Sequence, residues 1–264
     1  MEVKEILNHG LTLAQADELL DKVVEFPEID AKFERVRPIT DFRKDDYEAR
    51  VLYICRRLPS SSSSDDESQD NAKASQEELF ILKCKVQAPS VLAGGLKDPV
   101  AGPSEHTTAE LQALERFGSE KAEGLPHLIA WKKTAQMGAG WPMPGGYAVY
   151  VVMTMMPGLH LMDLGYWGIE ESEREEIREK FLGVIQSVWR MGFEPYDTAL
   201  RNILWERETK TLSIVDFEHW HPTTTDPINM HSQQEMQRWG LVKRPASTTH
   251  WEEWFLSEGL TRKR

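Results

Sequence analysis

The sequence is poor in cysteine and in positive charge, and it has no long apolar run. Its 264 residues include only two cysteines, Cys55 and Cys84, which form no closely spaced metal or redox motif. We expect them to be reduced core residues of a cytoplasmic protein. Because acidic residues outnumber Lys and Arg by 43 to 31, the net charge of −12 offers no basic surface for nucleic acid. The longest apolar stretch, 147–157, is too short to cross a bilayer, so we expect a protein that does not enter membranes.

The first residues also lack the continuous apolar run of a signal peptide. A capping-box pattern at Thr12 and Gln15 comes before apolar residues at helical spacing, which predicts an amphipathic helix over 13–25. We interpret residues 1–38 as an N-terminal helical extension that packs on the domain behind it.

The next region, 39–158, has the pattern of a small antiparallel sheet with one main helix. Segments 50–55 and 79–86 are rich in β-branched, aromatic and other apolar residues, as strands are. Between them, residues 59–78 hold a run of serines and many acidic side chains, a composition that predicts a disordered insert within a hairpin. The remaining expected elements are a capped helix from Thr107 to Phe117 and strands at 125–131 and 147–156.

The last region, 159–264, is predicted to be mainly helical. Its longest helix has a single apolar face and ends at Gly192. Short strands at 202–205 and 212–215 then form a hairpin. Two short helices, 233–241 and 251–256, are expected to close the region, with four aromatic residues in its core, namely Trp239, Trp251, Trp254 and Phe255.

The loop between the long helix and the hairpin carries oxygen side chains at a spacing suited to phosphoryl transfer. Asp197 and Asn202 are five residues apart, and Asp216 follows the second strand of the hairpin. A carboxylate and an amide oxygen suit Mg²⁺, and a second carboxylate can orient an acceptor hydroxyl and accept its proton. Both residue types also form ordinary turns. The order of helix, loop, strand, turn and strand before Asp216 favours the chemical interpretation.

This arrangement resembles the kinase catalytic loop, in which an Asp lies five residues before an Asn and a hairpin ends in Asp-Phe-Gly. With Asp216-Phe217-Glu218 and Arg201 beside Asn202, the sequence is similar to small, fungal-type kinase-like proteins related to aminoglycoside and choline phosphotransferases. The resemblance implies an α+β, two-lobed protein-kinase-like fold, with an antiparallel N-lobe and a shortened, mainly helical C-lobe. It further implies ATP and Mg²⁺ as cofactors, Asp197 as the catalytic base, and Asn202 and Asp216 as metal ligands.

A kinase-like N-lobe also needs a strand lysine for the phosphates and a helix glutamate to hold it. Lys83 and Lys85 share one face of their strand, and the apolar residues before Lys83 favour it over Lys85. The alternative is that both are solvated lysines on an edge strand. Glu110 is the expected partner, although with Thr107 it also fits a capping box that would only close its own helix start.

The remaining implied positions have weaker sequence support. Glu115 is the fallback partner for the lysine. Tyr150–Met156 would be the strand that leads to the adenine-binding hinge, with Met153, Met155 and Met156 beside the nucleotide. His219 and His221 resemble a metal pair, but they have no third ligand at a convincing spacing.

Three features depart from the kinase pattern. The sequence has no Gly-x-Gly-x-x-Gly loop and has the acidic stretch 41–46 where such a turn would lie. Pro195 occupies the position, two before Asp197, at which the family usually has a bracing His. Glu218 replaces Gly and adds a negative charge beside the expected metal ligand.

Two functions follow from this pattern. The first is transfer of the ATP γ-phosphate to a hydroxyl acceptor, a small molecule or a protein. The second is a pseudokinase that binds nucleotide or a partner without turnover. A metal-dependent hydrolase that uses the two Asp residues would leave the lysine strand and Glu110 without a role.

Overall fold

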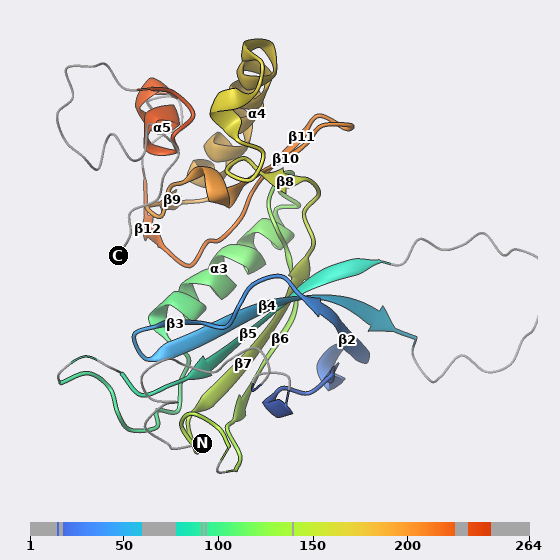
Figure 1. The fold of residues 1–264 in the computed structure, drawn as a ribbon, viewed down its shortest axis with the longest axis vertical. Helices are drawn as coiled ribbons and strands as arrows, with labels where there is room; N and C mark the ends of the chain where they lie inside the picture. Colours follow the sequence, from blue (N-terminus) through green and yellow to red (C-terminus); the bar gives the residue numbers. More distant parts are fainter. Residues whose placement is uncertain are drawn as a thin grey trace, which may run out of the picture. The chain divides into compact units, whose positions relative to one another are not determined.

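The computed structural model describes residues 15, 18–59, 78–90, 92, 94–138, 140–224 and 232–243. The chain divides into two compact units. Unit 1 consists of Met1–Glu105 and Leu128–Met155, and unit 2 consists of His106–His127 and Met156–Arg264. Together they combine antiparallel sheets with three helices in the described residues, which confirms the α+β class (Figure 1).

Unit 1 is built on a seven-stranded sheet in which every ladder is antiparallel. The strand order is β1-β2-β4-β5-β7-β6, and β3 pairs with β4. A short 3-10 helix joins β1 to β2. The strands are β1 (Val23–Phe26), β2 (Ala31–Pro38), β3 (Arg43–Asp45), β4 (Glu48–Leu58), β5 (Leu79–Gln87), β6 (Leu128–Ala135) and β7 (Tyr147–Thr154).

The central strands β5 and β7 are buried on both faces, as their nearly continuous apolar sequences require. The β4 and β5 ladder runs from Glu48 opposite Gln87 to Arg56 opposite Leu79, which confirms that the polar insert joins the two strands of a hairpin. The insert itself, 60–77, lies outside the described residues.

The N-terminal expectation was partly wrong. Gln15, Glu18 and Leu19 are helical, but the predicted helix over 13–25 gives way to strand β1 at Val23. Two adjacent valines favour a strand, and β1 pairs in register with β2. The burial of β2 alternates, with Ala31 and Phe33 inward, so its period of two was a strand signal that the sequence reasoning missed. The rest of the helix prediction falls on residues that the structure does not describe.

Unit 2 combines the helices with short strands. Its 3-10 helices are η2 (Tyr166–Gly168) and η3 (Leu200–Asn202). The helices are α3 (Glu105–Ser119), α4 (Glu171–Arg190) and α5 (Ser232–Arg238), and the strands are β8 (Leu159–His160), β9 (Phe193–Pro195), β10 (Ile203–Glu206), β11 (Thr211–Ile214) and β12 (Trp220–Pro222). Strands β11, β10 and β8 form one small sheet, and β12 and β9 form another.

The long helix and the hairpin appear where the sequence predicted them. The apolar face of α4 is fully buried at Ile177, Phe181, Ile185 and Val188, and the chain leaves the helix through Gly192 at a φ of 90°. Trp239 is buried as expected, whereas the helix expected over 251–256 lies beyond the described part of the chain.

Helix α3 differs from the expectation of an N-lobe helix, because nearly all of it groups with unit 2. Ala113 and Phe117 belong to the core of that unit, and the Phe117 ring contacts Phe193 and Phe217 edge-on at centroid distances of 5.5 and 4.6 Å. Leu125, expected in a strand, is also part of this core, and β6 begins only at Leu128. These apolar contacts give the physical reason for the grouping.

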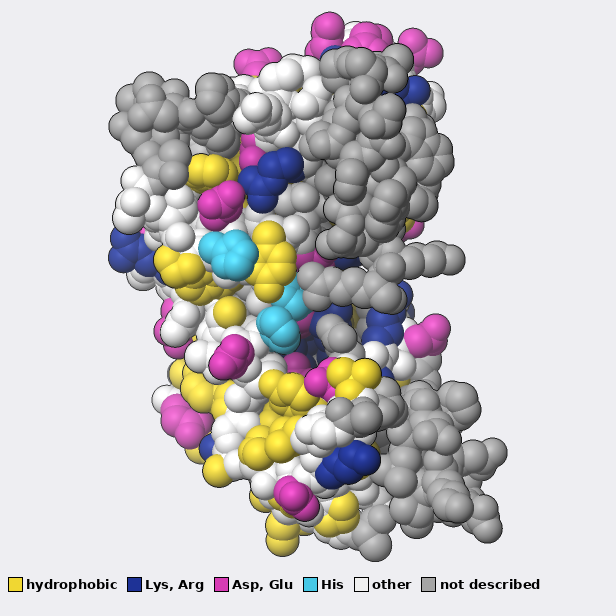
Figure 2. All heavy atoms as spheres, turned by 90° about the vertical axis from the view of Figure 1, so that its left-hand side faces the viewer, with side chains coloured by type: hydrophobic (Ala, Val, Ile, Leu, Met, Phe, Trp, Pro, Cys, Tyr) yellow, Lys and Arg dark blue, Asp and Glu magenta, His cyan; other side chains and the backbone are white. Residues whose placement is uncertain are grey.

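Acidic and basic side chains are interspersed among the described side chains on the face shown in Figure 2, and no basic patch gathers there. Among the described helices, none combines the length and the apolar composition that a bilayer crossing requires.

Candidate functional site

The loop predicted to carry the chemistry lies in unit 2, between two local frameworks. On one side, β9 pairs with β12, with Pro195 opposite Trp220. On the other side, the β10 and β11 hairpin follows η3, and the Val215 amide donates to the Asn202 carbonyl at 2.9 Å. These backbone hydrogen bonds fix the two ends of the loop, and Asn202 is held at its carbonyl by the residue that precedes Asp216.

Asp197 is held by a side chain from its own loop. Arg201 Nη2 donates to both carboxylate oxygens at 2.7 Å, and 29% of the Asp197 side chain remains exposed. Asn202 is buried and donates from Nδ2 to the Asp197 carbonyl at 2.8 Å. This contact orients the amide so that its Oδ1 is the atom suited to a cation.

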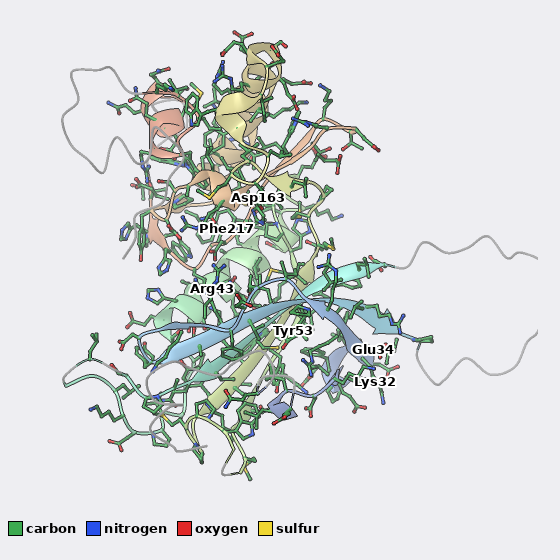
Figure 3. The ribbon with its side chains drawn as sticks, in the orientation of Figure 1. Lys32, Glu34, Arg43, Tyr53, Asp163 and Phe217 are labelled. Carbon is green, nitrogen blue, oxygen red and sulfur yellow. The ribbon has the colours of Figure 1, made fainter. Side chains whose placement is uncertain are left out.

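Asp216 has an unusual backbone conformation, with a φ of 68°, two residues after the end of β11. A left-handed conformation costs a non-glycine residue on the order of 1 kcal/mol. Phe217 is buried against Phe117 in the core and anchors the segment behind Asp216 (Figure 3). The core thus keeps Asp216 in a conformation that its own preference disfavours.

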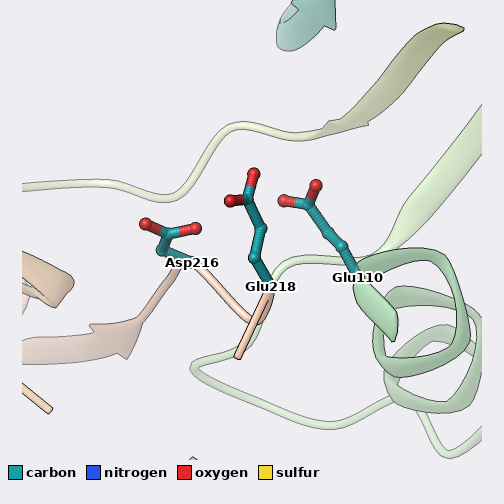
Figure 4. Close-up of side chains that lie close together, drawn as sticks. All are labelled: Glu110, Asp216 and Glu218. Carbon is teal, nitrogen blue, oxygen red and sulfur yellow. The ribbon is translucent and has the colours of Figure 1, made fainter. Parts of the chain in front are cut away.

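Three carboxylates meet at this point (Figure 4). Glu110 from α3, Asp216 and Glu218 each present an oxygen, and these oxygens lie within 4.8 Å of one another. Glu110 and Glu218 are almost fully buried. Hard oxygen donors at this spacing fit Mg²⁺ chemically, and the role of Asn202 as a further ligand stays a prediction.

The structure also rules out one of the two interpretations of Glu110. Helix α3 begins at Glu105, so Thr107 and Glu110 lie inside it and the capping-box interpretation is wrong. Glu218 was not predicted as a ligand, although an acidic residue in place of the usual glycine was a sequence signal for it.

The expected nucleotide residues belong mostly to unit 1. Lys83 and Lys85 are buried on the central strand β5, so the alternative of solvated lysines on an edge strand is wrong. Lys85 Nζ lies 3.7 Å from a Glu48 oxygen, and Glu48 accepts a hydrogen bond from Tyr147. This contact lies within unit 1, and a role of Lys83 or Lys85 at the phosphates stays a prediction.

Met153 and Met155 are also in unit 1, and Met156 is the first residue of the second segment of unit 2. Met153 is buried on β7, whereas Met155 is 40% exposed just beyond that strand. Because Lys83 and Glu110 belong to different units, the expected ion pair between them stays a prediction, as does an adenine site at the methionines.

The loop is braced on one side by an aromatic pair. The Tyr196 amide donates to the His219 carbonyl, and the Tyr196 hydroxyl shares a hydrogen bond of 3.1 Å with His219 Nδ1. Burial lowers the pKa of His219, and the nearby His106 lowers it further, so the imidazole is neutral at pH 7. The exposed His221 instead stacks on the Tyr196 ring at 4.5 Å.

No protein-family model matches the sequence. No curated protein matches it either. Among solved structures, the chain is similar to one titled "Structure of the Cydia pomonella Granulovirus kinase, PK-1", with a TM-score of 0.44 and 12% sequence identity. The match covers 81% of this chain and 57% of the viral chain, so this chain spans a little over half the length of that kinase. A likeness of this degree concerns coarse fold alone, and the relation to aminoglycoside and choline phosphotransferases stays a prediction.

Proposed function

We propose that this chain is a kinase-like phosphotransferase that moves the γ-phosphate of ATP to a hydroxyl acceptor with the help of Mg²⁺. The observation that carries the proposal is the local geometry of unit 2. Asp197 is partly exposed, is held by Arg201 and is hydrogen-bonded to an oriented Asn202, and the same unit contains a cluster of three carboxylates that includes Asp216. Phosphoryl transfer depends mainly on positioning and charge stabilisation, and this set of residues can supply both.

In this proposal Asp197 orients the acceptor. The acceptor O–H donates to an Asp197 oxygen, the hydroxyl oxygen forms a bond to the γ-phosphorus, and the bond from that phosphorus to the β,γ-bridging oxygen breaks. The proton passes to Asp197 and then to water, and ADP leaves. Arg201 keeps both carboxylate oxygens in place, which restricts the position of an acceptor hydroxyl bound to Asp197.

Asn202 and Asp216 are proposed to hold Mg²⁺, with Glu218 as a further oxygen donor. These residues would hold the ion, which would supply positive charge to offset the negative charge of the phosphates. Lys83 is assigned the phosphates, because the three apolar residues before it match the kinase pattern better than the residues before Lys85 do. Glu110 is assigned to support the site, and the acceptor is left as a small molecule or a protein hydroxyl.

The test compares wild-type protein with Asp197→Asn and Asp216→Asn, and with Asp163→Asn as a control at an exposed carboxylate of the same unit. The thermal midpoint is measured with ATP, with and without Mg²⁺, and ADP formation is measured over a panel of hydroxyl compounds. We expect Asp197→Asn to keep the Mg²⁺·ATP shift and lose about 10²- to 10⁴-fold in turnover. Asp216→Asn should lose the Mg²⁺ dependence of the shift.

Each outcome separates the two candidate functions. A wild-type midpoint that Mg²⁺·ATP leaves unchanged would remove both nucleotide-dependent functions. A nucleotide shift without ADP formation on any acceptor, and with no difference between wild type and Asp197→Asn, would favour the pseudokinase. The Pro195 substitution in the loop is the observation that keeps this second candidate in the test.

A further inference from the structure

Arg238, the last residue of α5, contacts the candidate catalytic loop on both sides of Asp197. Its Nη2 donates to the Pro195 carbonyl at 2.6 Å, and its Nη1 lies 3.4 Å from a Glu194 oxygen. Its backbone carbonyl accepts a hydrogen bond of 2.9 Å from the Thr198 hydroxyl. One residue from a distant part of the sequence therefore fixes the chain before and after Asp197.

Arg238 is itself held in place by a buried acid. Glu235 is 3% exposed, and its Oε2 accepts from Arg238 Nη1 at 2.8 Å, while its Oε1 accepts from Trp239 Nε1 at 2.8 Å. Burial raises the pKa of Glu235, and the adjacent Arg238 opposes that rise. A buried acid with two donors and a charged partner defines one orientation for the guanidinium.

The segment that carries Arg238 is anchored in the core of unit 2. The Trp239 indole is buried and packs on Phe181 at a centroid distance of 5.4 Å. The Tyr166 hydroxyl donates to the Leu241 carbonyl at 3.0 Å. The backbone that carries Arg238 is thus fixed by core packing, unlike that of a side chain on a loosely held surface segment.

The contacts of Arg238 complement those of Arg201. Arg201 holds the carboxylate of Asp197, whereas Arg238 holds the backbone at Pro195 and the side chain at Thr198. Proline has no backbone N–H and no polar side chain, so Pro195 contributes only a carbonyl to the bracing of this loop. A guanidinium that donates to that carbonyl supplies the cross-link from outside the loop.

We propose that Arg238 is the positioning residue for the Asp197 loop and that, together with Glu235, it replaces the bracing that a side chain at position 195 does not provide. This inference rests on the proposed phosphotransfer for its effect on rate. Its structural part, the bracing of residues 193–202, holds or fails independently of that activity.

The test uses the full chain with Arg238→Met and Arg238→Lys, and Arg207→Met as the matched control. Arg207 also pairs with a glutamate of unit 2, Glu173 at 2.8 Å, but lies on the β10–β11 turn. Hydrogen exchange of peptides covering 193–202 is the first measurement. We expect Arg238→Met to speed exchange there about tenfold, the loss that one charge-assisted hydrogen bond represents, with α4 peptides unchanged.

The second measurement is phosphate transfer with the acceptor found active for the wild type. A misplaced loop should lower kcat about 10- to 100-fold while the Kd for Mg²⁺·ATP changes less than about twofold. Arg238→Lys should recover part of kcat, because it keeps the charge beside Glu235. A third variant, Arg238→Ala, tests chemical rescue: free guanidinium at millimolar concentration should partly restore its kcat and leave the kcat of Arg207→Met unchanged.

Unchanged exchange of 193–202 in Arg238→Met would overturn the proposal. So would a loss of kcat that Arg207→Met reproduces. If Arg238→Met exchanges faster at 193–202 but the wild type transfers no phosphate, the bracing is supported and only the proposed function is rejected. If Arg238→Met does not fold, Arg238→Lys and Glu235→Gln carry the same exchange measurement, and faster exchange at 193–202 is expected in both.

Discussion

The two units differ in how regular their secondary structure is. The sheet of unit 1 has long antiparallel ladders and central strands that are buried almost throughout, and its buried Lys85 lies beside an acid. The site segment of unit 2 has short strands and a 3-10 turn, a non-glycine residue at positive φ, and three carboxylates in one place. Positive φ at described non-glycine residues also occurs at Asp30 and Asp46 in unit 1 and at Lys121 and Lys210 in unit 2, so the cluster of three carboxylates is what distinguishes the site segment.

We expect the largest change in stability from a substitution in the buried sheet of unit 1. Leu82 is fully buried on β5, so Leu82→Ala should lower the free energy of unfolding by about 3 kcal/mol, through lost burial and the cavity left behind. Urea unfolding measures the change.

The control is Leu79→Ala on the same strand, where 36% of the residue is exposed. It should cost less than about 1 kcal/mol. Equal losses at both positions would contradict the view that burial in the sheet dominates the stability of unit 1.

The second prediction has the opposite sign and concerns the site. Asp216→Gly relieves the left-handed conformation and removes one of three clustered carboxylates, so it should raise the free energy of unfolding by about 1 kcal/mol. The same substitution should abolish the Mg²⁺-dependent thermal shift with ATP.

Asp30→Gly is the matched control in unit 1, because Asp30 also has a positive φ, of 44°, away from the carboxylate cluster. Its stability should rise similarly while the nucleotide response is kept. If Asp216→Gly destabilised the protein, the strain at the site would not be the cost that we infer.

Sequence reasoning reached the β4–β5 and β10–β11 hairpins and the long helix α4 because their signals are local. Period-two burial, a single apolar helix face and Gly192 each act through neighbours in the chain. The same reasoning singled out Asp197, Asn202 and Asp216 from their spacing around a hairpin; the structure joins Asn202 to Asp197 by a hydrogen bond, and the shared role of the three residues stays a prediction.

What the sequence did not reveal depends on distant contacts. Nothing local marks Arg238 as a partner of Pro195, since 43 positions separate them and the contact depends on how α5 packs. The grouping of α3 with unit 2 likewise follows from Phe117 meeting Phe193 and Phe217, residues far along the chain. The β1 strand was missed because a helical period overlapped with two valines that pair with β2.

The smallest effect concerns the pH dependence of the loop brace at His219. In the folded state the pKa of His219 is below its ordinary value of 6.5, because burial and His106 disfavour the imidazolium more than Glu218, Asp197 and Asp216 favour it. As the pH falls below about 7, the unfolded chain takes up a proton at this residue before the folded one does. Stability should therefore fall as the pH decreases from 7 through 6.5 towards the lower folded pKa, and stay level above this window.

His219→Gln removes this titration and keeps a polar side chain beside Tyr196. Urea unfolding at pH 7.5 and 5.5 should show a smaller loss of stability on acidification in His219→Gln than in the wild type. His221→Gln, at the exposed ring stacked on Tyr196, should keep the wild-type loss. An equal loss in wild type and His219→Gln would mean that protonation of His219 does not cause the loss of stability. The comparison between the site of unit 2 and the sheet of unit 1 would then rest on Asp216 alone.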